Sequence, residues 1–85
     1  MAAVTHARNG LRRKVSTLIR KQFPGAKLNL DPPEGRLTGL MIWEGFMGLE
    51  QLDRQNRLWK ALRSNLSRDE QHQIAAILTM TPLER

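Results

Sequence analysis

Two stretches of the chain carry apolar residues at helical spacing. In the first stretch these residues are Leu11, Val15, Leu18 and Ile19. This i, i+4, i+7, i+8 pattern predicts an amphipathic helix over residues 10–22, with Asn9 as its cap. Chain ends fray unless they are tied down, so we expect residues 1–8 to form a flexible tail ahead of a single domain over residues 9–85.

The second stretch predicts the longest helix of the protein. Its apolar residues at helical spacing are Leu49, Leu52, Trp59, Leu62 and Leu66. Gln55 lies on the same stripe, whereas the charged residues, Arg54 and Arg57 among them, are expected elsewhere around the helix. A Gly-Phe-Met-Gly turn over residues 45–48 precedes this helix. We therefore expect the core and any functional site to meet here.

Alternation with a period of two predicts strands between the helices. Residues 26–30 alternate apolar and polar side chains, which predicts a strand with one buried face. The Asp-Pro-Pro-Glu-Gly segment at 31–35 predicts a turn, and residues 36–43 predict a second strand, antiparallel to the first. The second strand is apolar on both faces, so we expect it to be central, with Gly39 marking a close approach or a bulge.

The C-terminal part of the chain predicts a short helix and a third strand. Ser67 with Glu70 three residues later has the spacing of a capping box. The apolar run Ile74–Met80 then predicts a buried strand. This strand must return across a helix, so it can lie parallel to a strand of the hairpin. The sequence thus predicts an α/β (α+β) domain of order αββααβ, with a three-stranded mixed sheet packed by helices on one face.

Positive charge is concentrated in the N-terminal helix. Before Asp31 there are seven basic residues and no acidic one, and from Asp31 onward there are seven basic and eight acidic residues, a net charge of −1. Two interpretations stay open: a solvated helix face, or a surface that attracts phosphate backbones or an acidic partner. The candidate nucleic-acid-binding residues are Arg12, Arg13, Lys14, Arg20, Lys21 and Arg57.

Few groups in the sequence suit catalysis or metal binding. There is no cysteine, no Walker loop and no His-Glu-x-x-His or Gly-x-Ser-x-Gly signature. His72 is the candidate metal ligand, although a lone histidine at a strand entrance is more often a hydrogen-bonded surface residue. We expect a non-catalytic protein. The absence of cysteine, signal peptide and long apolar run also leads us to expect a cytoplasmic location and no membrane contact.

The segment Gly45-Phe46-Met47-Gly48 has the spacing of the G-x-x-G loop that clamps nucleic-acid backbones in KH domains. That loop joins two helices and usually carries basic residues. This one links a strand to a helix and carries Phe and Met. We favour a strand-to-helix turn in which Phe46 fills the core.

Four motifs, taken in order, resemble those of BolA-like proteins. They are Phe46-Met47-Gly48, Leu52-Asp53-Arg54, Arg57-Leu58 and the closing Ile-Leu-Thr-Met-Thr-Pro-Leu-Glu at 77–84. In that family an F-x-G turn leads into a helix that opens with Arg-His, and the last strand ends in Thr-Pro. The resemblance covers about residues 11–84 and implies a three-stranded α/β sandwich similar to a type II KH domain.

The resemblance implies two functions. Many BolA-like proteins pair with monothiol glutaredoxins and share a [2Fe–2S] cluster, to which the BolA partner gives a histidine near the start of the last strand. The implied function is thus a non-catalytic adaptor that docks on a monothiol glutaredoxin-type partner in iron–sulfur cluster handling. Some members are DNA-binding regulators, so the alternative is a nucleic-acid-binding transcriptional or stress regulator that uses the KH-like fold and the basic N-terminal helix.

The sequence departs from the family pattern at both histidines. Gln73 stands where the ligand histidine is expected, with His72 one residue earlier, and Gln55 replaces the histidine of the Arg-His motif. A carboxamide is a poor iron ligand, and a one-residue shift within a strand turns a side chain to the opposite face. His72 can therefore replace position 73 only if the strand starts later. We expect no cofactor on the chain alone and a [2Fe–2S] cluster only when it is shared with a partner. The candidate partner or cluster residues are His72, Gln73, Gln55, Arg54, Phe46 and Gly48.

Overall fold

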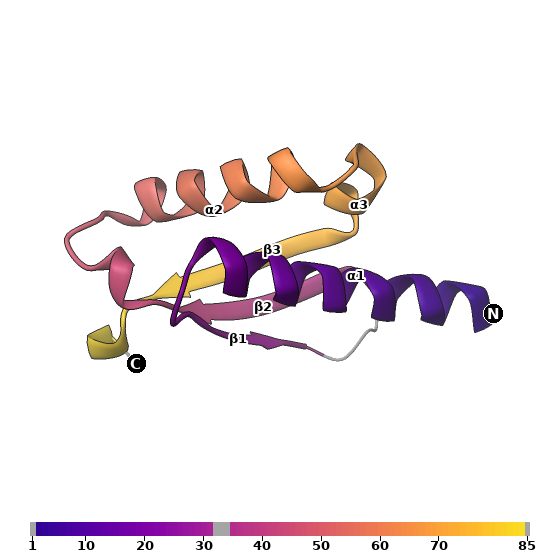
Figure 1. Ribbon diagram of the computed structural model, residues 1–85, viewed down its shortest axis with the longest axis horizontal. Coiled ribbons are helices and arrows are strands. Elements are labelled where there is room, and N and C mark those ends of the chain that lie inside the picture. The colour runs from indigo at the N-terminus through magenta and orange to yellow at the C-terminus, as the bar shows by residue number, and fades with distance from the viewer. Residues whose placement is uncertain (1, 32–34, 85) are drawn as a thin grey trace.

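The structure, a computed structural model, describes residues 2–31 and 35–84, with side chains described from residue 10 onward. The elements are α1 (Ala2–Gln22), β1 (Lys27–Leu30), β2 (Leu37–Ile42), the 3₁₀ helix η1 (Glu44–Phe46), α2 (Gln51–Asn65), α3 (Arg68–His72), β3 (Ile74–Met80) and the 3₁₀ helix η2 (Pro82–Glu84). The predicted fold class and the order αββααβ are confirmed (Figure 1). The predicted turn at 31–35 falls mostly on residues 32–34, which lie outside the described residues.

The sheet has the order β1-β2-β3, with β2 in the centre as predicted. β1 and β2 are antiparallel, with Lys27 opposite Ile42 and Leu30 opposite Gly39, whereas β3 runs parallel to β2. A Cβ atom on Gly39 would lie 2.7 Å from Leu30 Cδ2 and 2.8 Å from the Asn29 carbonyl oxygen. Gly39 therefore marks the predicted close approach of two strands.

The core lies between the sheet and the two long helices. α1 contributes Val15 and Ile19, which are almost completely buried. The sheet contributes Met41 of β2 and Ile77 of β3. Figure 1 shows α1 and α2 running in opposite directions along the sheet. The helical face of the sheet is thus closed by these two helices, while Leu78 on β3 remains 65% exposed.

α1 begins at Ala2, eight residues before Gly10, so the helix start that we predicted is wrong. With 21 residues against 15 in α2, α1 is also longer than the helix that we predicted to be the longest. Asn9 lies inside the helix instead of capping it, and the predicted tail over residues 1–8 falls within α1 from Ala2 onward. The alanines and the arginine that precede Asn9 are strong helix formers, and the cost of Gly10 in a helix is only about 1 kcal/mol. A helix that is already nucleated by packing at Leu11 can extend through such a residue.

The predicted apolar stripe of α2 is confirmed at Leu62 and Leu66, which are buried, and wrong at Leu52. Leu52 is 70% exposed, whereas Arg54, which we placed on another side, is buried together with Leu58 and Leu62. These three residues follow an i, i+4, i+8 pattern, so the buried face of the first turns includes Arg54 instead of Leu52. Arg54 can be buried because its charge is paired with Glu84.

Candidate functional site

The short helix α3 leads into the candidate ligand residues. Its Ser67 Oγ accepts from the Glu70 N–H at 3.1 Å, and Glu70 Oε1 accepts from the Ser67 N–H at 2.8 Å, so the predicted capping box is confirmed. Glu70 also pairs with Lys14 of α1 at 3.0 Å. The pKa of Glu70 is lowered, mainly by the hydrogen bond from the Ser67 N–H and next by the hydrogen bond from Lys14. The pair of Lys14 and Glu70 thus links α3 to α1.

His72 ends α3, and Gln73 follows it as the C-cap residue in a helical conformation. The His72 side chain is exposed, whereas Gln73 is half-buried and its Nε2 donates to the Asp69 carbonyl at 3.5 Å. β3 begins only at Ile74, after both residues. The two side chains therefore leave a helical backbone about 100° apart, not from opposite faces of a strand. The condition under which His72 could replace position 73 is met.

Arg36 fixes the backbone at this junction. Its Nε donates to the His72 carbonyl at 3.0 Å, and its Nη2 donates to the Ile74 carbonyl at 3.1 Å. Between them, the Gln73 carbonyl accepts from the Leu37 N–H at 2.7 Å. Three consecutive carbonyls are thus bound to the start of β2. Sequence reasoning missed this role of Arg36, and its place directly before the central strand was the only signal.

Arg54 forms an ion pair that links α2 to the C-terminal segment. Its Nη1 and Nη2 donate to the two carboxylate oxygens of Glu84 at 2.6 and 3.0 Å, and its Nε donates to the Leu49 carbonyl at 2.8 Å. Glu84 also accepts from the Thr81 N–H at 2.9 Å. The Arg54 guanidinium first, and the Thr81 N–H second, lower the pKa of Glu84 from 4.5 to about 2. The Thr-x-x-Glu spacing at 81–84 is a capping pattern, and it could have revealed the contact between the Thr81 N–H and Glu84.

Phe46 and Gly48 lie in the turn between β2 and α2. Phe46 is completely buried, and its ring packs edge-to-face on Trp43 at 5.1 Å between centroids. Gly48 has a φ of +83°, in the left-handed region that favours glycine. The turn is the predicted strand-to-helix connection, with Phe46 in the core. An aromatic ring inside the core cannot contact a nucleic-acid backbone.

Gln55 is bound to the outer edge of β3. Its Nε2 donates to the Ile77 carbonyl at 2.8 Å and lies 3.3 Å from Thr79 Oγ1. One turn earlier, the Gln51 Nε2 donates to the Thr79 carbonyl at 3.0 Å, and Gln51 Oε1 accepts from Thr79 Oγ1 at 2.7 Å. β3 is an edge strand, so these amides occupy backbone acceptors that another strand could otherwise use. No sequence pattern indicated this pairing.

The candidate partner or cluster residues do not gather at one place. His72 and Gln73 precede β3, whereas Arg54, Phe46 and Gly48 lie near its far end, and Figure 1 shows α3 and the C-terminus at opposite ends of this strand. The seven residues of β3 span about 20 Å. Gln55 contacts the strand between the two ends. A small ligand can therefore meet only one of these groups.

The candidate nucleic-acid-binding residues are also divided. Arg12 donates to the carbonyls of Asp31 and Leu30, and Lys14 pairs with Glu70. Arg57 lies over the Trp43 ring, with 5.5 Å from its guanidinium carbon to the ring centroid. The other three, Arg13, Arg20 and Lys21, are exposed on α1.

The described residues include no group of three or more His, Cys, Asp or Glu side chains that could hold a metal ion. No described helix has the length and apolar character that a membrane crossing requires. Among the described residues, His72 remains the candidate metal ligand that the sequence predicts.

Comparisons by sequence with protein-family models and with curated proteins find no match. Comparison of the structures finds a shared fold. BolA1 from Arabidopsis thaliana is 17% identical, with a TM-score of 0.68 over 88% of this chain and 95% of that chain. The BolA domain of SufE1 from the same plant is 17% identical, with a TM-score of 0.65 over 86% and 93% of the two chains. A BolA protein homologue from Coxiella burnetii is 20% identical, with a TM-score of 0.64 over 85% and 91%.

Proposed function

We propose that this chain, which has the fold of the BolA proteins, is a non-catalytic adaptor that docks on a monothiol glutaredoxin-type partner in iron–sulfur cluster handling. The observation that carries the proposal is the exposed His72 directly before β3, one residue ahead of the position, Gln73, at which the family resemblance implies a ligand histidine. The partner contact would centre on His72 and Gln73.

The donor groups of this chain do not fit a cluster held by the chain alone. They fit a shared [2Fe–2S] cluster to which the chain gives one imidazole, because histidine is a known ligand of such clusters. His72 suits this role because its side chain is exposed while Arg36 fixes its backbone. Gln73 suits it less, because its amide points back to the Asp69 carbonyl and a carboxamide is a weak ligand for iron.

The proposal is tested by an anaerobic NMR titration of the isotope-labelled chain with a monothiol glutaredoxin, first apo and then loaded with its cluster. We expect shifts around residues 72–74 with both forms, and paramagnetic broadening centred on His72 with the loaded form. The variant His72→Gln should keep the shifts and lose the broadening. The variant Gln73→His should strengthen the binding of the cluster by restoring an imidazole at the family position.

The variant His6→Gln is the matched control, because it removes the other histidine of the chain and should change neither signal. Shifts without broadening in the native chain would support an adaptor that binds no cluster. If neither form of the glutaredoxin moves any resonance, the proposal is wrong.

Binding of nucleic acid by the basic helix α1 is the second candidate function, but the side chains support it less. Of the six cations proposed for this function, Arg12 and Lys14 already bind groups within the chain, and Arg57 of α2 lies against an aromatic ring. Phosphate binding would show as an affinity that falls steeply with salt, by about one log unit per log unit of salt for each phosphate neutralised. If no short DNA or RNA strand binds at low salt, this alternative is wrong.

A further inference from the structure

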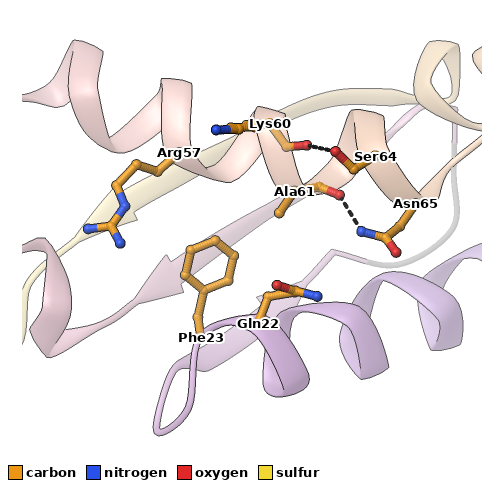
Figure 2. A pocket seen from close by; sticks show the side chains of 7 residues that line it. All are labelled: Gln22, Phe23, Arg57, Lys60, Ala61, Ser64 and Asn65. Atoms are coloured by element: carbon orange, nitrogen blue, oxygen red, sulfur yellow. Dashed lines mark hydrogen bonds between the residues drawn. The ribbon is translucent and has the colours of Figure 1, made fainter.

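A groove of about 420 Å³ lies between the C-terminal end of α1 and the second half of α2 (Figure 2). Arg57 and Lys60 of α2 are on its lining, and no acidic side chain is among the lining residues. Figure 2 shows the Phe23 ring standing between the two helices, below Ala61 of α2. The groove thus combines positive charge along one wall with apolar surface between the walls.

Arg57 is held in position before any ligand arrives. Its guanidinium lies over the Trp43 ring at 5.5 Å, and the Trp43 Nε1 donates to the Pro24 carbonyl at 3.0 Å. Trp43 also packs edge-to-face on Phe23, with 5.0 Å between the ring centroids. A cation supported in this way loses less side-chain entropy when it binds an anion than a free one does.

The charges of this wall are available. Among the described residues, no ion pair involves Arg57 or Lys60, and Asp53, one turn before Arg57, pairs with neither. The polar side chains farther along the groove are already used within α2: Ser64 Oγ donates to the Lys60 carbonyl and Asn65 Nδ2 donates to the Ala61 carbonyl. The two cations therefore determine which ligand charge the groove favours.

We propose that this groove is a docking site for an acidic segment of a partner protein. Carboxylates of the segment pair with Arg57 and Lys60, and an apolar side chain between them contacts Ala61 and the small exposed part of Phe23. Arg20 and Lys21, exposed in the last turn of α1, add positive charge near the end of the groove and steer the acidic segment toward it. The site uses no residue of the α3–β3 junction, so it is independent of the proposed function.

A protein segment fits this groove better than a nucleic acid does. Binding of single strands relies on aromatic faces on which bases stack. Here Phe23 is 5% exposed, and one face of Trp43 is occupied by Arg57. Carboxylates on a short peptide need only the two cations and the small apolar floor, which the groove supplies.

The test is an NMR titration of the full chain with a synthetic peptide in which glutamates alternate with leucines. We expect shifts of the Trp43 indole N–H and of the amides of Phe23 and Ala61, with an affinity that falls as salt is added. The variant Lys60→Gln should weaken binding about threefold to tenfold, and Arg57→Gln combined with Lys60→Gln by more than about tenfold. Lys60→Gln does not touch Trp43, so it remains informative if the double variant folds poorly.

The matched control is Arg63→Gln, which removes a cation from an exposed position of α2 outside the groove lining. It should leave the affinity nearly unchanged, and a peptide with glutamine in place of glutamate should not bind. The proposal is overturned if the peptide moves no groove resonance, or if Arg63→Gln weakens binding as much as Lys60→Gln. It is also overturned if a short oligothymidylate binds the same resonances more tightly than the acidic peptide.

Discussion

Replacement of Phe46 by alanine should remove much of the stability of this protein. The Phe46 side chain is completely buried, and it packs on Trp43 at 5.1 Å and on Phe23 at 6.4 Å between ring centroids. Loss of a buried phenylalanine costs about 3–5 kcal/mol, through lost transfer free energy and the cavity left behind. A domain of this size has a free energy of unfolding of about 5–8 kcal/mol, so Phe46→Ala consumes roughly half of it.

Urea denaturation followed by tryptophan fluorescence measures this effect, because Trp43 lies against the affected ring. With a slope of about 1.5 kcal/mol per molar urea, the midpoint should fall by about 2–3 M. Met47→Ala is the matched control, because Met47 follows Phe46 in the same turn and is 49% exposed. A surface substitution of this kind usually changes the free energy of unfolding by less than about 1 kcal/mol.

The result also decides between two roles for the Gly45–Gly48 turn. If Phe46→Ala lowers the midpoint by less than about 0.5 M, the energy assigned to this ring is refuted. If the stability is unchanged but binding of nucleic acid is lost, the turn acts as a clamp and not as a core connection. A large loss of stability with Phe46→Ala and a small one with Met47→Ala supports the core role.

Two further predictions concern the polar contacts. Because the pKa of Glu84 is lowered to about 2, its ion pair stabilises the fold above pH 4.5 and is lost as the pH falls toward 2. Glu84→Gln should therefore be less stable than the native chain at neutral pH and should lose less stability as the pH falls from 4.5 toward 2. The matched control is Glu44→Gln, outside any ion pair within the described residues, which should keep the stability of the native chain at neutral pH. Equal pH profiles for Glu84→Gln and the native chain would contradict a stabilising role of the Arg54–Glu84 pair. Gln55→Ala leaves the Ile77 carbonyl unpaired and should cost about 1–2 kcal/mol in urea denaturation, whereas Asn56→Ala, at the next and exposed position, should cost less than about 0.5 kcal/mol; similar losses for the two variants would show that the amide of Gln55 contributes nothing.

The sequence could not show which candidate site residues lie close together, because these residues are far apart along the chain. The resemblance gave a set of candidate residues, but it could not place them relative to one another. His72 and Arg54 lie at opposite ends of β3, so one small ligand does not reach both. The groove that includes Arg57 and Lys60 was also invisible in the sequence, because its opposite wall is the end of α1.

Local patterns in the sequence were sufficient for the order of the α-helices and strands, although not for the start of α1. The spacing of Ser67 and Glu70 predicted the capping box, and the apolar run Ile74–Met80 predicted the bounds of the strand. Its predicted burial is wrong, because β3 is an edge strand with Ala75, Ala76 and Leu78 exposed. The two apolar faces of residues 36–43 predicted the central strand. These features depend on neighbours within a few residues, so the sequence by itself determined them.

The tertiary structure decided which side of α2 is buried. A helix with apolar residues around much of its circumference can bury more than one face, and the choice depends on what each face meets in the folded chain. Arg54 is buried because Glu84, thirty residues later, accepts two hydrogen bonds from it, whereas Leu52 remains exposed. Gln55 likewise hydrogen-bonds to β3, and Arg57 packs over the Trp43 ring. Pairings between residues distant in sequence exist only once the chain has folded, and they determine which side chains remain free for function.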